Sequence, residues 1–287
     1  MTKIKVSTDS TADLPRELAR ELGVDVLPMT IIIDGKEYAD GVDLTTQEFY
    51  EILNNCAELP TTSQVTGACY QELFTKTWEE GYTHLIHTSI NSLGSGTYQA
   101  ALLNRELFFE EHPEARGQLE ITVIDSLTYS MGYGWGVIEG ARLAKSGASP
   151  EEVVAAIEDW IHHHKILVVP MNLRFCKKSG RVSAAAAFVG DAMGLKPIIT
   201  FENGESKVLS KVRGDKKAVT AMVDMMVKER KPGTDYCMAY TADPALREQV
   251  EELLGEKVEQ MPSLTYPLGA IISANIGPDS VGLIFHV

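Results

Sequence analysis

Apolar strands and amphipathic helices alternate along the first half of the chain. Short apolar runs occur in "KIKVSTDS", "THLIHTSI" and "LEITVIDS", and helical patterns lie between them, as in "ADLPRELARELG" and "TYQAALLNRELFFEEH". Strands that alternate with helices are typical of a parallel sheet whose two faces are covered by helices. The first half therefore predicts a mostly parallel, helix-flanked sheet.

The pattern changes near residue 165. "KILVVPM" reads as an apolar strand, and "KPIITFENGESKVLSKVRG" predicts a hairpin that turns at Asn203-Gly204. A helix of small residues is expected over "SAAAAFVGDAMG", and further helices and strands alternate to the end of the chain. The predicted fold class is a two-domain α/β protein. Residues 1–164 form an N-terminal α/β domain, and residues 165–287 form a C-terminal α/β domain with a mixed sheet.

Three hydroxyl residues stand together in "ELPTTSQVTGACYQELF", residues 58–74, where a loop is expected to enter a helix: Thr61, Thr62 and Ser63. A helix N-cap uses one such hydroxyl, which accepts from a free backbone N–H group. A helix N-terminus also attracts an anion, because it carries unpaired N–H groups and a partial positive charge. On this stretch alone capping is favoured, and ligand binding stays open.

Polar residues also end three predicted strands of the first half: Thr8-Asp9-Ser10, Asn91-Ser92 and Asp125-Ser126. Ligands of open α/β sheets lie beyond the carboxyl ends of the strands, so we expect these loops to form one site. Its hydroxyls and amides suit a carboxylate or phosphate rather than a metal. Asp9 and Asp125 could form an acid–base pair. At such junctions Asp more commonly holds loop amides, which we favour.

Composition and charge narrow the class of protein. The chain has 287 residues, of which 44% are hydrophobic and 23% charged, as in soluble globular proteins. It contains no apolar run near 18 residues, so no membrane segment is expected, and we see no signal peptide. The four cysteines are scattered without a CxxC pair, which indicates free thiols in a reducing cytoplasm: Cys56, Cys69, Cys176 and Cys237.

The net charge of −14 argues against nucleic-acid binding, but it is unevenly distributed. Residues 174–217 carry ten Lys or Arg and four Asp or Glu, so this window is +6 and the remainder is −20. A solvated face explains such a window, and so does docking to an acidic partner.

Familiar enzyme motifs are missing. Gly94-Ser95-Gly96 follows Leu93 rather than a glycine, so the chain lacks a G-x-S-x-G nucleophile elbow there. The sequence has no phosphate-binding P-loop, and no G-x-G-x-x-G follows the first strand. We therefore expect neither a cofactor nor a metal.

Taken together, the motifs make the chain resemble the DegV family, the fatty-acid-binding subunits of bacterial fatty acid kinase. The resemblance spans nearly the whole chain. It is carried by "TDSTADL" at 8–14, "PTTSQ" at 60–64, "SGTYQAA" at 95–101, "DS" at 125–126, "KKSGR" at 177–181, "LKPII" at 195–199, "KVRGDKKA" at 211–218 and "GP" at 277–278.

The resemblance implies a cytoplasmic lipid carrier without chemistry of its own, which binds one long-chain fatty acid between its two domains. It would present the carboxylate to a fatty acid kinase catalytic subunit, similar to dihydroxyacetone kinases, for acyl-phosphate formation. Thr61 and Ser92 would bind the carboxylate, and Thr62 or Ser63 would cap the next helix. The full expected ligand set is Thr61, Thr62, Ser92, Asn275, Ser10 and Ser126. The expected docking residues are Arg174, Lys177, Arg213 and Lys217.

The chain departs from the family pattern in two places. Asn275 stands where members often carry His, and in "NSLGSG" Asn91 and Gly94 replace a serine and a leucine. Two other functions stay open beside the carrier. One is a small-molecule hydrolase or phosphotransferase that uses Asp9 or Asp125, and the other is an orphan ligand sensor.

Overall fold

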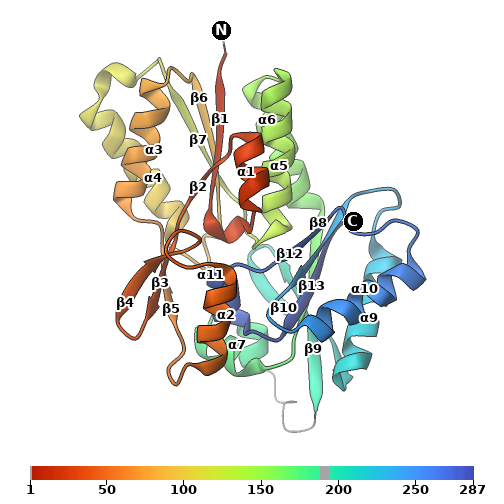
Figure 1. The fold of residues 1–287 in the computed structure, drawn as a ribbon. Helices are drawn as coiled ribbons and strands as arrows, with labels where there is room; N and C mark the ends of the chain where they lie inside the picture. Colours follow the sequence, from red (N-terminus) through yellow and green to blue (C-terminus); the bar gives the residue numbers. More distant parts are fainter. Residues whose placement is uncertain (1, 188–193) are drawn as a thin grey trace. The chain divides into compact units, whose positions relative to one another are not determined.

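The computed structural model describes residues 2–187 and 194–287. The chain divides into two compact units. Figure 1 colours the ribbon by position in the sequence. Unit 1 comprises Met1–Thr30 and Thr62–His162, and unit 2 comprises Ile31–Thr61 and His163–Val287. The division near residue 163 lies close to the boundary expected between residues 164 and 165. Prediction of a single boundary missed one feature: residues 31–61 group with the C-terminal half of the chain in unit 2.

A helix explains why residues 31–61 group with unit 2. Helix α2 (Thr46–Asn55) begins with a capping box between Thr45 and Glu48. It packs against α11 (Ala270–Ile276). The hydroxyl of Tyr50 on α2 donates to the Leu268 carbonyl at 2.6 Å. The sequence pattern indicates the helix, but not the distant partner against which its buried face packs.

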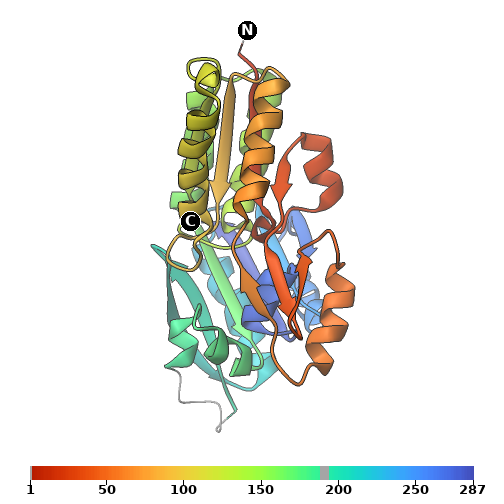
Figure 2. The same cartoon turned by 90° about the vertical axis from the view of Figure 1, so that its left-hand side faces the viewer.

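Unit 1 contains a parallel sheet with strands in the order β2-β1-β6-β7, as predicted. Helices α1, α5 and α6 lie on one side of it and α3 and α4 on the other, and α3 and α4 face the viewer in Figure 2. Its elements are β1 (Ile4–Asp9), η1 (Ser10–Ala12), α1 (Arg16–Leu22), β2 (Asp25–Leu27), α3 (Gly67–Glu79), β6 (His84–Ser89), α4 (Thr97–Glu111), η2 (Pro113–Ala115), β7 (Glu120–Asp125), α5 (Met131–Ser146) and α6 (Pro150–His163).

The central strands β1 and β6 are buried from their second residue to their last. A strand between two parallel neighbours with helices on both faces has no solvent side, so its residues are buried continuously, whether apolar or polar. This burial carries the polar residues at the ends of the strands, Asp9 and Ser89, into the interior as well.

Unit 2 contains a mixed sheet in the order β10-β9-β8-β13-β11-β12. β11 and β12 are parallel, and the other neighbours are antiparallel. The strands are β8 (His164–Pro170), β9 (Leu195–Glu202), β10 (Glu205–Arg213), β11 (Tyr236–Tyr240), β12 (Leu264–Pro267) and β13 (Ser280–His286). The hairpin turn lies at Asn203 and Gly204, as predicted, and both have positive φ, 50° and 82°.

The core of unit 2 forms where α9 (Asp215–Glu229) and α10 (Pro244–Lys257) meet the sheet. Met222 and Met226 of α9 are fully buried there with Leu167 and Phe285. Helices α7 (Leu173–Ser179) and α8 (Ser183–Ala186) pack against each other. Part of the helix predicted over 183–194 lies outside the described residues. Within the described ranges, no helix is long and apolar enough to cross a membrane.

A small sheet in the order β4-β3-β5 contains two of the three places where the chain passes between the units. Its strands are β3 (Thr30–Ile33), β4 (Lys36–Ala39) and β5 (Thr61–Ser63). Asp34 and Gly35, an Asp-Gly pair typical of a tight hairpin turn, lie between β3 and β4, and both have positive φ. The hydroxyl run 61–63, which was expected to enter a helix directly, is a strand instead.

Candidate functional site

The carboxyl ends of β1, β6 and β7 meet at one edge of the unit 1 sheet. Thr8 is paired with Thr88 and Ser89 with Asp125, so the three strands end side by side. Their loops are hydrogen-bonded to one another. Ser126 N donates to Ser89 O at 3.0 Å, and Ile90 N donates to Asp9 Oδ2 at 2.8 Å. The three polar loops predicted from the sequence therefore do lie together.

Asp9 holds this edge together from inside. Its side chain is fully buried, and Oδ1 accepts from the Thr11 amide at 3.1 Å, from the Thr11 hydroxyl and from Tyr133 Oη at 2.7 Å. Oδ2 accepts from the Ile90 amide and from Ser89 Oγ at 3.4 Å. Burial raises the pKa of Asp9, and the hydrogen bonds from Thr11, Ile90 and Tyr133 act in the opposite direction.

Asp125 has a similar role at the end of β7. Its Oδ1 accepts from the backbone amides of Ser92 and Leu127, each at 3.1 Å. Both carboxylates thus bind loop amides, which is the role that the sequence favoured over an acid–base pair. Asp9 fixes the loop after β6 to β1, and Asp125 fixes the same loop to β7.

Three of the expected ligand residues lie on these loops of unit 1. Ser10 is half-buried, and its hydroxyl accepts from Met29 N at 3.2 Å. Ser126 is buried, and its hydroxyl bonds the amide and carbonyl of Thr128, both at 3.3 Å. Ser92 is half-buried, beside the Asp125 carboxylate. Unit 1 therefore brings Ser10, Ser92 and Ser126 to the same edge of its sheet.

The expected cap of helix α3 was assigned to the wrong residue. Thr66 is the N-cap, and its hydroxyl accepts from Cys69 N at 3.4 Å, whereas Thr62 and Ser63 lie in β5. An N-cap must lie within three residues of the amide it satisfies, and α3 begins only at Gly67. The hydroxyls of Thr61 and Thr62 are therefore not needed to cap this helix.

Of the other expected ligand residues, Thr62 begins the second segment of unit 1, and Thr61 and Asn275 lie in unit 2. Thr61 is exposed at the start of β5, so its pairing with Ser92 in unit 1 stays a prediction. Asn275 is half-buried on α11, and its Nδ2 donates to Ile271 O of the same helix at 2.6 Å. That bond fixes the amide so that Oδ1 points away from the Ile271 carbonyl. A ligand contact by Asn275 also stays a prediction.

The four expected docking residues are all exposed, but they lie on three different elements. Arg174 and Lys177 are on α7, and an Arg174 guanidinium nitrogen lies 3.4 Å from the Ala57 carbonyl. Arg213 ends β10, and Lys217 lies in the first turn of α9. They form two pairs within unit 2, one on α7 and one at the connection between β10 and α9.

Sequence reasoning missed the buried partners of the polar edge. Tyr133 on α5 and Thr11 in η1 share the Asp9 carboxylate, and their hydroxyls lie 2.7 Å apart. Asn91 Nδ2 donates to the hydroxyl of Tyr129 at 2.8 Å. The one sequence signal for these tyrosines is their position shortly after "DS", because a helix that starts there must pass the ends of β1 and β6.

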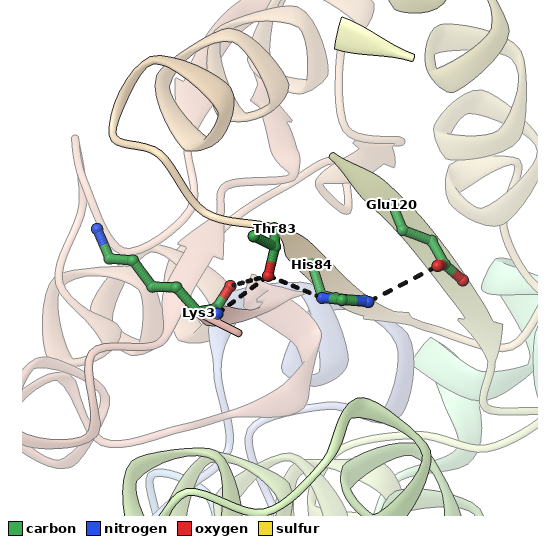
Figure 3. A network of polar contacts seen from close by, with 4 residues as sticks. All are labelled: Lys3, Thr83, His84 and Glu120. Carbon is green, nitrogen blue, oxygen red and sulfur yellow. Dashed lines mark hydrogen bonds and ion pairs between the residues drawn. The ribbon is translucent and has the colours of Figure 1, made fainter. Parts of the chain in front are cut away.

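A second polar network lies at the amino ends of the same strands (Figure 3). Lys3 N donates to Thr83 Oγ1 at 3.0 Å, and that hydroxyl lies 2.9 Å from His84 Nδ1. His84 Nε2 lies 3.7 Å from a Glu120 carboxylate oxygen. These contacts join the starts of β1, β6 and β7, at the end of the sheet opposite the candidate site.

Comparison with known proteins identifies the family to which this sequence is similar. A family model described as uncharacterised proteins of the DegV family matches residues 3–287. A DegV domain-containing protein of Caldanaerobacter subterraneus is 33% identical over 100% of this chain and 99% of its own.

Solved structures agree with this assignment. One, described as fatty acid binding of a DegV family protein from Thermus thermophilus, is 30% identical with a TM-score of 0.85 over 100% of both chains. Another is a fatty acid binding DegV family protein from Streptococcus agalactiae, 28% identical with a TM-score of 0.85 over 99% of this chain and 98% of that one. The chain belongs to the DegV family.

Proposed function

We propose that this protein binds one long-chain fatty acid and presents its carboxylate to a partner kinase, which forms the acyl-phosphate. The observation that carries the first part is the likeness over the full chain to the Thermus thermophilus fatty-acid-binding protein, at 30% identity. The polar edge of unit 1 supports it, because Ser10 and Ser92 are only half-buried there and offer neutral hydroxyls that suit a carboxylate.

Head group and tail would make different contributions. A hydrogen bond to a charged group contributes about 1.5–3 kcal/mol, and each buried CH₂ of an acyl chain about 0.8 kcal/mol. A long tail then supplies most of the affinity, while Thr61 and Ser92, with Thr62, Asn275, Ser10 and Ser126 around them, orient the carboxylate. The expected position of the fatty acid between the two domains stays a prediction.

The partner would be a cytoplasmic fatty acid kinase catalytic subunit, similar to dihydroxyacetone kinases, and it would dock on Arg174, Lys177, Arg213 and Lys217. The exposure of all four supports this, because exposed cations can steer an acidic surface. A hydrolase or phosphotransferase that uses Asp9 or Asp125 is less well supported, since both carboxylates already bind loop amides.

The test combines identification of the ligand with mutation of the head-group residues. Denaturing mass spectrometry of the purified protein should release a fatty acid. After delipidation, Thr61→Val with Ser92→Ala should weaken oleate binding at least tenfold, since two bonds worth about 1.5–3 kcal/mol each are lost.

The matched control is Thr220→Val with Ser146→Ala. These hydroxyls bond carbonyls of their own helices, α9 and α5. This control should bind oleate like the wild type. Release of a nucleotide or sugar phosphate in place of a fatty acid, or equal oleate affinity in both double variants, would show that the proposal is wrong.

A further inference from the structure

The loop Asn91–Gly96, between β6 and α4, carries Ser92 and is bonded to the loop that follows β7. Asn91 N donates to Thr128 O at 3.2 Å, and Ser92 N donates to Asp125 Oδ1 at 3.1 Å. Inside the loop, Asn91 O accepts from the amides of Gly94 and Ser95, both at 3.1 Å. The backbone of Asn91 therefore makes three of the hydrogen bonds that hold this loop in its conformation.

The Asn91 side chain is itself oriented by Tyr129. Asn91 is fully buried, its Oδ1 accepts from Leu93 N at 3.0 Å, and its Nδ2 donates to Tyr129 Oη at 2.8 Å. An amide group has distinct donor and acceptor ends. The Leu93 amide can only donate, so it selects the Oδ1 end of Asn91, and the Tyr129 hydroxyl accepts from the opposite Nδ2 end. Tyr129 thus helps to hold the Asn91 amide in the orientation that supports the turn at Leu93.

Gly94 makes room for the same hydroxyl. A Cβ built on Gly94 would lie 2.4 Å from Tyr129 Oη and 3.3 Å from Cζ. The backbone of Gly94 is outside the left-handed region, so its conformation does not require glycine. The close approach of the Tyr129 phenol instead explains why residue 94 is a glycine. Asn91, Gly94 and Tyr129 are thus one structural unit.

We propose that Tyr129 is a positioning residue for the ligand head group. Its hydroxyl holds the loop Asn91–Gly96 in the conformation that directs Ser92 toward a carboxylate. The inference rests on the proposed function, because it takes Ser92 as a carboxylate ligand. It adds a residue that acts through Asn91 and sets how well the site distinguishes a free carboxylate from other head groups.

The first measurement needs no ligand. Hydrogen exchange of the Gly94 and Ser95 amides in delipidated protein should accelerate about 2- to 10-fold in Tyr129→Phe, since one hydrogen bond is worth about 0.5–1.5 kcal/mol. Gly94→Ala should also accelerate it in the wild type, but add little in Tyr129→Phe, where the nearest remaining ring atom lies 3.3 Å from the new Cβ.

Gly96→Ala is the matched control for Gly94→Ala. Its Cβ would meet Gln64 Oε1 at 2.1 Å, the far end of an exposed and flexible side chain that can swing aside. Its effect on loop exchange should be small and the same with or without Tyr129→Phe. Equal, additive effects of Gly94→Ala in both backgrounds would overturn the coupling of Gly94 with Tyr129.

The second measurement separates positioning from a general structural role. Tyr129→Phe should weaken binding of oleate about 2- to 10-fold and leave binding of methyl oleate unchanged, because only oleate has the carboxylate. Equal losses for both lipids, or no loss for oleate, would overturn the inference. If the wild type itself fails to bind oleate, the proposed function is at fault, and that outcome is distinct from either of these.

Discussion

Asp9 shows how one residue can organise a site without belonging to its surface. It is fully buried, yet five donors from η1, β6, the loop after β6 and α5 reach its two oxygens. Such a carboxylate is tolerated because nearly every lone pair is satisfied. The sequence shows an Asp at a strand end, but the α5 donor, Tyr133, comes from 124 residues away along the chain.

Asp9→Asn should destabilise the protein, because an amide NH₂ would face the donors of Ile90 and Ser89. One unsatisfied buried group costs about 1–3 kcal/mol, which urea unfolding would measure. The loss should depend on pH. Because the folded pKa of Asp9 is raised, its stabilising contribution is full below the unfolded pKa of 3.8 and decreases as pH rises through the folded pKa. The difference between wild type and variant should therefore be larger at pH 4 than at pH 7.

Asp125→Asn provides the control for Asp9→Asn. This carboxylate is half-buried and uses Oδ1 for both of its amide donors, so an asparagine can keep that oxygen in place. Its stability loss should be smaller. An Asp9→Asn protein that is as stable as Asp125→Asn at both pH values would contradict the assignment of Asp9 as the centre of the edge.

Among the elements, those specified by neighbouring residues were predictable from the sequence. The hairpin at Asn203-Gly204 and the strands ending at Asp9, Ser89 and Asp125 follow from local turn chemistry and apolar runs. Strand β5 was missed, because Thr61–Ser63 pairs with a strand some 30 residues earlier and has no apolar face of its own. For the site, the loops were predictable and their buried anchors were not, since Tyr129 and Tyr133 meet the loops only through tertiary packing.

The end of α11 offers a test of element packing. Gly277 has φ +93°, and a Cβ there would lie 2.6 Å from the ring of Phe175 on α7. Gly277→Ala should therefore lower the free energy of unfolding by about 1–3 kcal/mol, through backbone strain and the displaced ring.

Gly255→Ala in α10 is the matched substitution, because it has open space around it and helical backbone. It should raise the free energy of unfolding by about 0.5–1 kcal/mol, the difference in helix propensity. Denaturant titrations of both variants decide the point, and equal midpoints would refute the role given to Gly277.

Over the whole molecule, charge is unevenly distributed along the chain. The net charge is −14, while residues 174–217 are +6. Isolated exposed charge pairs contribute only about 0–1 kcal/mol to stability. A concentration of one sign instead affects how fast a partner of opposite sign associates, and salt weakens that effect.

Arg174→Glu with Lys217→Glu should leave oleate binding intact and slow acyl-phosphate formation with the cognate kinase. The wild-type rate should fall with ionic strength more steeply than that of the variant. Arg20→Glu with Lys76→Glu changes the net charge equally at exposed residues outside the window. Equal rates and equal salt dependence in the two double variants would indicate that residues 174–217 form an ordinary solvated surface and do not dock the kinase.

The bond between α2 and the segment before α11 has a consequence for synthesis of the chain. The apolar face of α2, with Phe49, Tyr50 and Leu53, is buried, but the Leu268 carbonyl that receives Tyr50 lies 218 residues later. At a translation rate of about 5–20 residues per second, that carbonyl leaves the ribosome about 10–45 s after Tyr50. Residues 31–61 also interrupt unit 1 along the chain, and the rest of unit 2 is synthesised only after His162. On the ribosome, α2 therefore stays without this partner for that time, and a chaperone can bind its apolar face in the interval.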